Sequence, residues 1–245
     1  DVVKLSKEEM RKKRQEMQII FQDPYASLNP RKTISQIIAD PLKINHIITD
    51  KNQQMDRVHE LMETVGLADR LINTYPHELD GGRRQRIGIA RALAMNPKFI
   101  VCDEPVSALD VSIQAQILNL LKELQHKMGL TYMFITHDLS VVNHFSDDIA
   151  VMYLGRLIEK APSEELFAHP THPYTQALLS AIPIPSLRNR RERIILKGEI
   201  TSPIEPPAAC RFANRCPHAT ERCHSAEPPL KEISPGHFVS CFLTD

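Results

Sequence analysis

Three short apolar runs along the chain each end in polar residues. They are MQIIF at 17–21, KFIVCDEP at 98–105 and TYMFITHD at 131–138. Apolar runs of this length, bounded by polar loops, predict buried strands. Open sheets of parallel strands place their ligands at the carboxyl ends of the strands. We therefore expect the polar residues that follow these runs to share one sheet edge and to form the candidate active site.

The segment between the second and third runs has the spacing of an amphipathic helix. Asp110 or Ser112 is placed to cap its start and Gly129 to end it, and its apolar positions are Ile113, Ile117, Leu120, Leu121, Leu124 and Met128. The order strand, helix, strand predicts a parallel β-α-β unit. Residues 148–161 then predict an antiparallel hairpin at the margin of the same sheet, with its turn near Gly155.

Residues 24–95 contain no comparable apolar run. A helix that ends at Gly66 is predicted by the apolar positions Met55, Val58, Met62 and Val65. Residues 82–95 have the pattern of a second helix. We interpret residues 24–95 as a helical insertion that interrupts the sheet.

The composition changes after about residue 181. Nine of the 18 prolines and four of the five cysteines follow that point, which predicts a small appendage with little regular structure. The predicted division is therefore a core formed by residues 1–23 and 96–185, a helical part at 24–95 and a Cys/Pro-rich appendage at 186–245.

With 245 residues, 42% hydrophobic and 24% charged, the chain has the composition of a globular protein with a substantial core. No apolar stretch approaches the roughly 20 residues that cross a bilayer, and the N-terminus lacks the layout of a signal peptide. The formal net charge is zero, so global electrostatics give no support to a nucleic-acid partner.

Several polar residues have the types and positions that nucleotide hydrolysis requires. Asp103 and Glu104 follow an apolar strand, where the first carboxylate can hold Mg²⁺ and the second can orient a water molecule. Gly81 and Gly82 open a helix, whose free N–H groups favour a phosphate. Gln22 offers an amide to Mg²⁺ or water. An acidic residue after an apolar strand is also common in ordinary domains, so nucleotide hydrolysis is indicated only by the whole set of residues.

This set resembles the ATP-binding subunit of an ABC transporter over residues 1 to about 185. The resemblance implies an α/β fold of the P-loop NTPase type, an ABC nucleotide-binding domain with an inserted helical subdomain, and binding of ATP and Mg²⁺. Residue by residue, it implies a Q-loop at Gln22, the signature sequence at Asp80, Gly81, Gly82 and Arg83, the Walker B aspartate at Asp103, the general base at Glu104, the D-loop at Asp110 and the switch histidine at His137.

The stretches FQDPYASLNPRKTI and HPYTQALLSAIP, together with the cysteine-bearing tail, are similar to the oligopeptide and dipeptide importer ATPases. That resemblance implies a second ATPase subunit, identical or a paralogue, two transmembrane permeases and, indirectly, an extracytoplasmic peptide-binding protein. The implied location is the cytoplasmic face of the cell membrane.

The chain departs from the family pattern at the phosphate-binding loop. No Gly-x-x-x-x-Gly-Lys-Ser/Thr occurs in the sequence. Because the family has this loop upstream of the Q-loop, we expect the sequence to be N-terminally truncated and, by itself, inactive; the alternative is an inactive relative.

The second departure lies in the signature, where Asp80 and Arg83 replace the usual Ser and Gln. A like-charge pair at about 4 Å costs on the order of 4 kcal/mol at an effective dielectric near 20. In a full-length background, Asp80→Ser is therefore expected to raise ATPase turnover several-fold. The alternative is that Arg83 pairs with Asp80 and holds it away from the phosphate.

The tail cysteines Cys210, Cys216, Cys223 and Cys241 lack the paired spacing of common zinc sites. Disulfides are disfavoured in the cytosol, which leaves metal ligation or free thiols. The resemblance implies a [4Fe-4S] cluster, with zinc or no metal as alternatives. His218, His224 and His237 are nearby alternative ligands, although a position at the surface is the favoured interpretation. We expect Cys102 to be a small core residue.

Two other functions remain open from the sequence. One is a soluble ABC-type ATPase that acts on nucleic acid or ribosomes, and the other is an inactive metal-binding scaffold. The proteins that co-purify with the chain would discriminate among the three.

Overall fold

The computed structural model describes residues 1–182, 193–199 and 204–244. Contacts within the chain group residues 1–137 and 138–245 into two compact units, which are described separately below. These units do not coincide with the predicted domains, because the predicted core segment 96–185 is divided between them.

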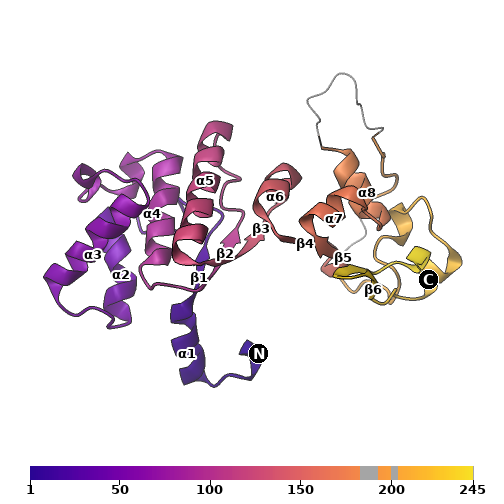
Figure 1. Ribbon diagram of the computed structural model, residues 1–245, viewed down its shortest axis with the longest axis horizontal. Helices are drawn as coiled ribbons and strands as arrows, with labels where there is room; N and C mark the ends of the chain where they lie inside the picture. The colour runs from indigo at the N-terminus through magenta and orange to yellow at the C-terminus, as the bar shows by residue number, and fades with distance from the viewer. Residues whose placement is uncertain (183–192, 200–203, 245) are drawn as a thin grey trace. The chain divides into compact units, whose positions relative to one another are not determined.

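The N-terminal unit contains a parallel sheet of three strands, β1 (Met17–Ile20), β2 (Phe99–Asp103) and β3 (Thr131–Ile135), in the order β1-β2-β3 (Figure 1). Ile20 pairs with Cys102, and Asp103 pairs with Ile135. The three predicted strands are confirmed, and their carboxyl ends lie at one edge of the sheet. The central strand is the least exposed because it is paired on both sides.

Helix α5 (Val111–Met128) connects β2 to β3 and completes the predicted β-α-β unit. Its buried face is formed by Ile117, Leu120, Leu121 and Leu124. Asp110 is the N-cap, and Gly129 ends the helix with φ 63°, a left-handed conformation that glycine adopts without a Cβ penalty.

The segment between β1 and β2 is helical, as predicted. Helices α2 (Ile34–Ile44), α3 (Lys51–Thr64) and α4 (Gly81–Leu93) pack against one another, and short 3₁₀ helices lie at Asp69–Leu71 and Pro76–Glu78. At the N-terminus, a 3₁₀ turn (Val2–Lys4) precedes α1 (Lys7–Glu16), which has no buried residue and begins with a capping box formed by Ser6 and Glu9.

The C-terminal unit contains an antiparallel sheet in the order β4-β5-β7-β6. Its strands are β4 (Asp148–Tyr153), β5 (Arg156–Pro162), β6 (Lys231–Ser234) and β7 (His237–Val239). The β4–β5 hairpin and its turn at Leu154 and Gly155 are confirmed. Its predicted place at the margin of the parallel sheet is wrong, because β5 pairs with β7 from the tail.

Helices α6 (Leu139–Phe145), α7 (Ser163–Ala168) and α8 (Pro173–Ser180) surround the hairpin, and α7 packs against both β4 and β5. The tail adds α9 (Glu221–Ser225) and 3₁₀ turns at Ala213–Arg215 and Phe242–Thr244. With two strands as well, it has more regular structure than the sequence predicted.

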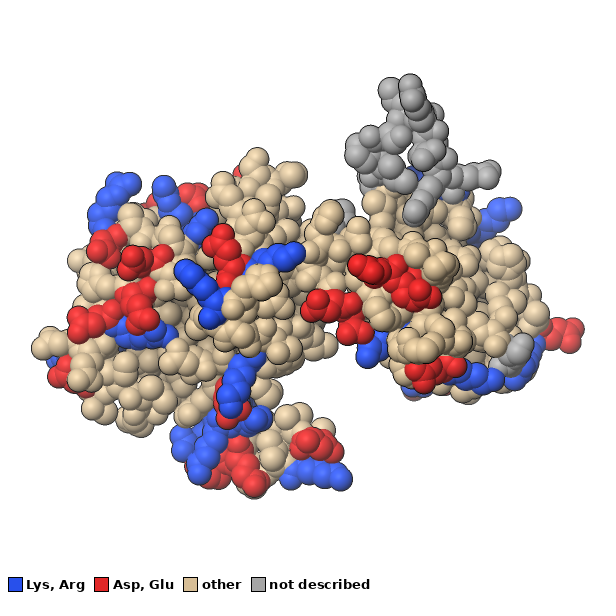
Figure 2. Space-filling model, in the orientation of Figure 1, with Lys and Arg blue, Asp and Glu red and all other residues tan. Residues whose placement is uncertain are grey.

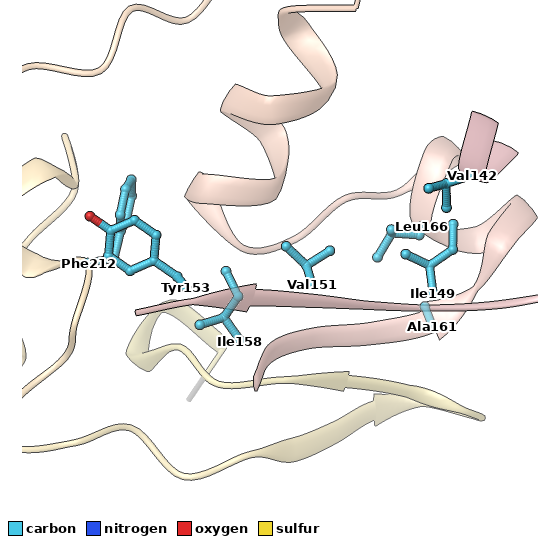
Figure 3. Close-up of a cluster of buried hydrophobic side chains, with 8 residues drawn as sticks. All are labelled: Val142, Ile149, Val151, Tyr153, Ile158, Ala161, Leu166 and Phe212. Carbon is cyan, nitrogen blue, oxygen red and sulfur yellow. The ribbon is translucent and has the colours of Figure 1, made fainter. Parts of the chain in front are cut away.

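The core of this unit lies on one face of the hairpin, because alternate residues of β4 are buried (Figure 3). Val151, Tyr153 and Ile158 point to the same side, and Phe212 from the tail packs edge-to-face against Tyr153. The tail therefore supplies part of the core of the C-terminal unit.

Candidate functional site

At the edge of the parallel sheet, the side chains of Gln22 and His137 meet at the carboxylate of Glu104. Gln22 Nε2 donates to Glu104 Oε2 at 2.7 Å, and His137 Nδ1 lies 3.0 Å from Glu104 Oε1. Glu104 directly follows β2, His137 follows β3, and Gln22 follows β1. Three residues far apart in sequence thus form one hydrogen-bonded group because their strands are parallel and adjacent.

The backbone of Glu104 is unusual. Its φ is 41°, in the left-handed region that non-glycine residues adopt rarely and usually where surrounding contacts enforce it. Glu104 N donates to the carbonyl of Ile135 at 3.0 Å, and its own carbonyl accepts from the Ser107 hydroxyl at 3.1 Å. These bonds fix the turn that aims the carboxylate at Gln22 and His137.

The electrostatics of the group favour an ionised Glu104. The hydrogen bond from His137 is the main cause that lowers the pKa of the Glu104 carboxyl, and Ser107 and Gln22 act in the same direction. Glu104 is therefore a carboxylate at neutral pH and can accept a proton. Gln22 and His137 are exposed, so the group is open to a ligand.

Asp103 is the last residue of β2 and is partly exposed beside this group. No three His, Cys, Asp or Glu side chains within the described ranges are arranged to hold a metal ion. Mg²⁺ in nucleotide sites often takes one or two protein ligands and completes its shell with phosphates and water. Asp103 and Gln22 fit that mode of binding.

The signature residues form the first turn of α4. Asp80 is the N-cap: its Oδ1 accepts from Arg83 N at 2.8 Å, and its Oδ2 lies 3.3 Å from Arg83 Nη1. The structure thus has the Asp80–Arg83 pair that the sequence left as an alternative. Both side chains are half-exposed.

The two glycines of the signature also have a packing role that sequence reasoning missed. A Cβ on Gly82 would lie 2.7 Å from Ile113 Cγ2, and one on Gly81 would lie 3.0 Å from Leu109 Cδ2. Glycine here lets α4 approach the start of α5 closely. Among the described residues, the hydrogen-bonded group at Glu104 does not include Asp110, which is the N-cap of α5, or the Asp80–Arg83 pair.

Two arginines of α4 hold the loop that follows Gln22. The Arg84 guanidinium lies 4.9 Å from the ring centre of Tyr25, and Arg91 donates to the carbonyl of Ser27 at 2.6 Å. Burial lowers the pKa of Arg91. The sequence feature that could have indicated these contacts is the series of arginines in the helix at 82–95, together with the aromatic residue Tyr25 in the loop.

The cysteines divide as predicted into one core residue and a tail group. Cys102 is fully buried in β2, where desolvation raises its pKa to about 12. In the tail, burial is the main cause that raises the pKa of the Cys241 thiol, and electrostatic repulsion from the other three cysteines acts in the same direction. The tail thiols are therefore neighbours.

This arrangement fits a metal cluster only in part. Burial raises the pKa of the Cys210 and Cys216 thiols, and backbone hydrogen bonding near Phe212 and His218 offsets part of that shift. In the described part of the chain, however, the cysteines are not arranged as a closed set of metal ligands. His218 and His224 are exposed as expected, whereas His237 is buried, contrary to the prediction.

Charges of both signs are interspersed over the face of the protein seen in Figure 2, in keeping with its zero formal net charge. Within the described residues, no helix has the length and apolar character needed to span a membrane.

Comparison with known proteins places the chain in a family. The model of the ABC transporter family matches residues 1–107, and that of the oligopeptide/dipeptide transporter C-terminal region matches residues 158–223. A putative oligopeptide transport ATP-binding protein, YkfD of Bacillus subtilis, is 55% identical over 241 residues, covering 98% of this chain and 73% of YkfD. Oligopeptide transport ATP-binding protein OppF of Salmonella typhimurium is 52% identical over 247 residues, covering all of this chain and 74% of OppF.

Solved structures give the same result. CbiO1 of Clostridium perfringens, part of the ABC transporter complex CbiONQ, is 30% identical with a TM-score of 0.60, covering 67% of this chain and 64% of that protein. The ATP-binding cassette MJ0796, bound to ADP and phosphate in a post-hydrolysis state, is 31% identical with a TM-score of 0.57, covering 65% of this chain and 68% of that one. The chain therefore belongs to the ABC-transporter ATP-binding subunits of the oligopeptide transport family.

Proposed function

We propose that this protein is the ATP-hydrolysing subunit that energises import of oligopeptides or dipeptides through a membrane ABC transporter. The observation that carries the proposal is the hydrogen-bonded group of Gln22, Glu104 and His137 at the carboxyl edge of the parallel sheet. It is supported by relatives that are named for oligopeptide transport and ATP binding.

In the proposed reaction, Glu104 accepts a proton from a water molecule as the water oxygen attacks the γ-phosphorus of ATP. The bond from that phosphorus to the bridging oxygen of ADP breaks, and ADP and phosphate leave. The lowered pKa of Glu104 keeps it in the acceptor form at neutral pH. Gln22 and His137 hold the carboxylate in one orientation, and His137 would contact the γ-phosphate.

Mg²⁺ would be held by Asp103 and Gln22. When bound, it neutralises phosphate charge during phosphoryl transfer. The acceptor role of Glu104 and the orienting roles of Gln22 and His137 are contributions of the chain itself.

The signature residues Asp80, Gly81, Gly82 and Arg83, together with Asp110, would serve a nucleotide shared with a second ATPase subunit, identical or a paralogue. The N-terminus of α4 favours an anion because its first N–H groups and helix dipole point outward. Two permeases would form the membrane part, with the ATPase at the cytoplasmic membrane face, and an extracytoplasmic peptide-binding protein would deliver the peptide.

The proposal is tested by co-expressing the tagged full-length protein with the second ATPase and the permeases and then measuring peptide uptake into vesicles. Glu104→Gln keeps the shape of the side chain but removes the proton acceptor, so ATPase turnover and uptake should fall at least about 100-fold while the complex still assembles. Glu123→Gln, an exposed position on α5, is the matched control and should retain both. Co-purification of nucleic acid or ribosomes in place of permeases would overturn the proposal.

For the tail, we propose that Cys210, Cys216, Cys223 and Cys241 hold a [4Fe-4S] cluster, with zinc as the competing metal. Anaerobic purification should give visible absorbance and iron in the protein, and Cys216→Ser should remove both. Stoichiometric zinc without iron would exclude the cluster, and a metal-free protein would exclude both.

A further inference from the structure

The C-terminal unit contains a carboxylate that is removed entirely from solvent. Glu159, on β5, is 0% exposed. Its two oxygens accept backbone N–H bonds from Thr171 at 2.7 Å and His172 at 3.0 Å. A buried carboxylate is costly unless hydrogen bonds and a positive charge compensate it, so its partners decide whether this region is stable.

His237 of β7 supplies the compensating group. The side chain is 1% exposed, and its Nε2 lies 2.8 Å from Glu159 Oε1. Its Nδ1 lies 3.5 Å from Glu165 Oε1 on α7. His237 therefore lies between two carboxylates, with its Nε2 in a hydrogen bond to Glu159 and its Nδ1 facing Glu165.

The other titratable groups nearby do not take this role. His172 is buried beside Glu159, but its Nδ1 accepts from Tyr174 N, and burial lowers its pKa to about 4, so the ring is neutral. His169 pairs with the outer oxygen of Glu165 at 3.1 Å. Among the described residues, His237 is therefore the histidine whose side chain hydrogen-bonds to Glu159.

The backbone contact between β7 and β5 is short. Only Glu159 with Val239 and Lys160 with Phe238 are paired, and the Ser240 N–H donates to the Ile158 carbonyl at 2.8 Å just beyond them. A ladder of this length gives limited stability by itself. The buried side-chain contacts must contribute to holding β7 in place.

The position of β7 also determines that of Cys241. Cys210, Cys216 and Cys223 all precede the β6–β7 hairpin, and the Cys210 N–H donates to the Cys223 carbonyl at 2.9 Å. Cys241 follows β7 by two residues, and electrostatic repulsion from the other three cysteines contributes to the raised pKa of its thiol. The hairpin therefore brings the fourth cysteine to a group that is otherwise locally connected.

We propose that Glu159, Glu165 and His237 form a lock that holds the β6–β7 hairpin against β5 and thereby fixes the position of Cys241. Loss of His237 removes the side-chain hydrogen bond between β7 and the buried Glu159 carboxylate, which favours local opening of the hairpin over the closed form. The lock concerns the C-terminal unit alone and does not depend on ATP hydrolysis.

The test measures modification of each cysteine by iodoacetamide in the full, metal-free chain under native conditions, by peptide mass spectrometry. His237→Ala should speed modification of Cys241 about tenfold and raise amide exchange across residues 237–239, since local opening governs both. His224→Ala, an exposed histidine in the same tail, should leave both within about two-fold. The lock is overturned if the His237→Ala variant shows wild-type rates of Cys241 modification and of amide exchange in β7.

Amide exchange in β4, which carries core residues of the same unit, reports unfolding of the whole C-terminal unit in the same experiment. If His237→Ala raises amide exchange in β4 as well, Glu165→Gln decides, because it changes only the partly exposed carboxylate of the lock. Faster modification of Cys241 with β4 still protected supports the lock, and unchanged modification of Cys241 overturns it.

Discussion

Glu104 combines a strained backbone with a carboxylate that is held at both oxygens. Its left-handed φ costs on the order of 1 kcal/mol, which the hydrogen bonds of the turn offset. With Gln22 on one oxygen and His137 on the other, the side chain has little freedom to rotate. A proton acceptor with a fixed orientation is what attack by a positioned water requires.

The hydrogen bond between His137 and Glu104 predicts how ATP hydrolysis depends on pH. Because this hydrogen bond is the largest cause of the lowered pKa of Glu104, His137→Ala should raise that pKa toward its ordinary value. The acid limb of the kcat/KM profile for ATP should then move to higher pH in the assembled transporter. His137→Gln keeps an N–H donor and should shift the limb less. If the acid limb of the profile stays at the wild-type pH in His137→Ala, the hydrogen bond from His137 does not set the pKa of Glu104.

The Asp80–Arg83 pair changes the expectation for the signature. Arg83 provides a backbone N–H to one oxygen of Asp80 and a guanidinium to the other, so the carboxylate charge is compensated within one helical turn. The repulsion anticipated from Asp80 alone is therefore reduced.

A double-mutant cycle in the assembled transporter tests this compensation. Arg83→Gln should lower ATPase turnover about tenfold, because it leaves an unpaired carboxylate near the proposed phosphate position. The same change in an Asp80→Ser background should lower turnover less than about three-fold, since no carboxylate remains. Equal losses in the two backgrounds would show that the residues act independently.

At the scale of the elements, hydrophobic periodicity predicted correctly the strands and helices whose formation depends on their own residues. The apolar runs that became β1, β2 and β3 carry their strand signal locally, and α5 has its apolar face, its N-cap region and Gly129 within one segment. The candidate site followed from these strands, because parallel neighbours end at one edge.

Elements that depend on distant partners could not be predicted in this way. The pattern of 148–161 shows a hairpin but not that β7 is the neighbour of β5. His237 looked like a surface residue because nothing close to it in sequence shows that Glu159 and Glu165 surround it. Likewise, the packing role of Gly82 depends on Ile113, which lies on another helix.

Two glycines of α4 give a matched test of that packing. Gly82→Ala places a methyl group 2.7 Å from Ile113 Cγ2 and should destabilise the protein by about 1–3 kcal/mol. Gly88→Ala meets no atom within 4 Å and should stabilise it by up to about 1 kcal/mol through helix propensity. Denaturant unfolding measures both. Similar effects at the two sites would contradict a specific contact between α4 and α5.

At the scale of the whole molecule, the two compact units have separate sheets and separate cores. The C-terminal unit draws its core from the hairpin, α6, α7 and the tail, with Phe212 at 1% exposure in its centre. Its stability therefore rests on residues that the sequence interpretation had assigned to two domains.

Residues 138–245 are accordingly expected to fold when expressed alone. The fragment should unfold cooperatively in denaturant, because its sheet and core are internal to the unit. Phe212→Ala should lower its stability by about 3–5 kcal/mol. His218→Ala, at an exposed tail position, should have little effect. A fragment without a cooperative transition would show that the unit needs the rest of the chain.

The place of β7 in its sheet has a consequence for biosynthesis. His237 lies 78 residues after Glu159, yet β7 is an inner strand, between β5 and β6. While the ribosome is still translating the intervening segment, the Glu159 carboxylate lacks its hydrogen bond to His237 and β5 has one open edge. This half of the protein can therefore reach its native state only late in translation, and nascent chains stalled before residue 237 should be the ones that proteases and chaperones capture.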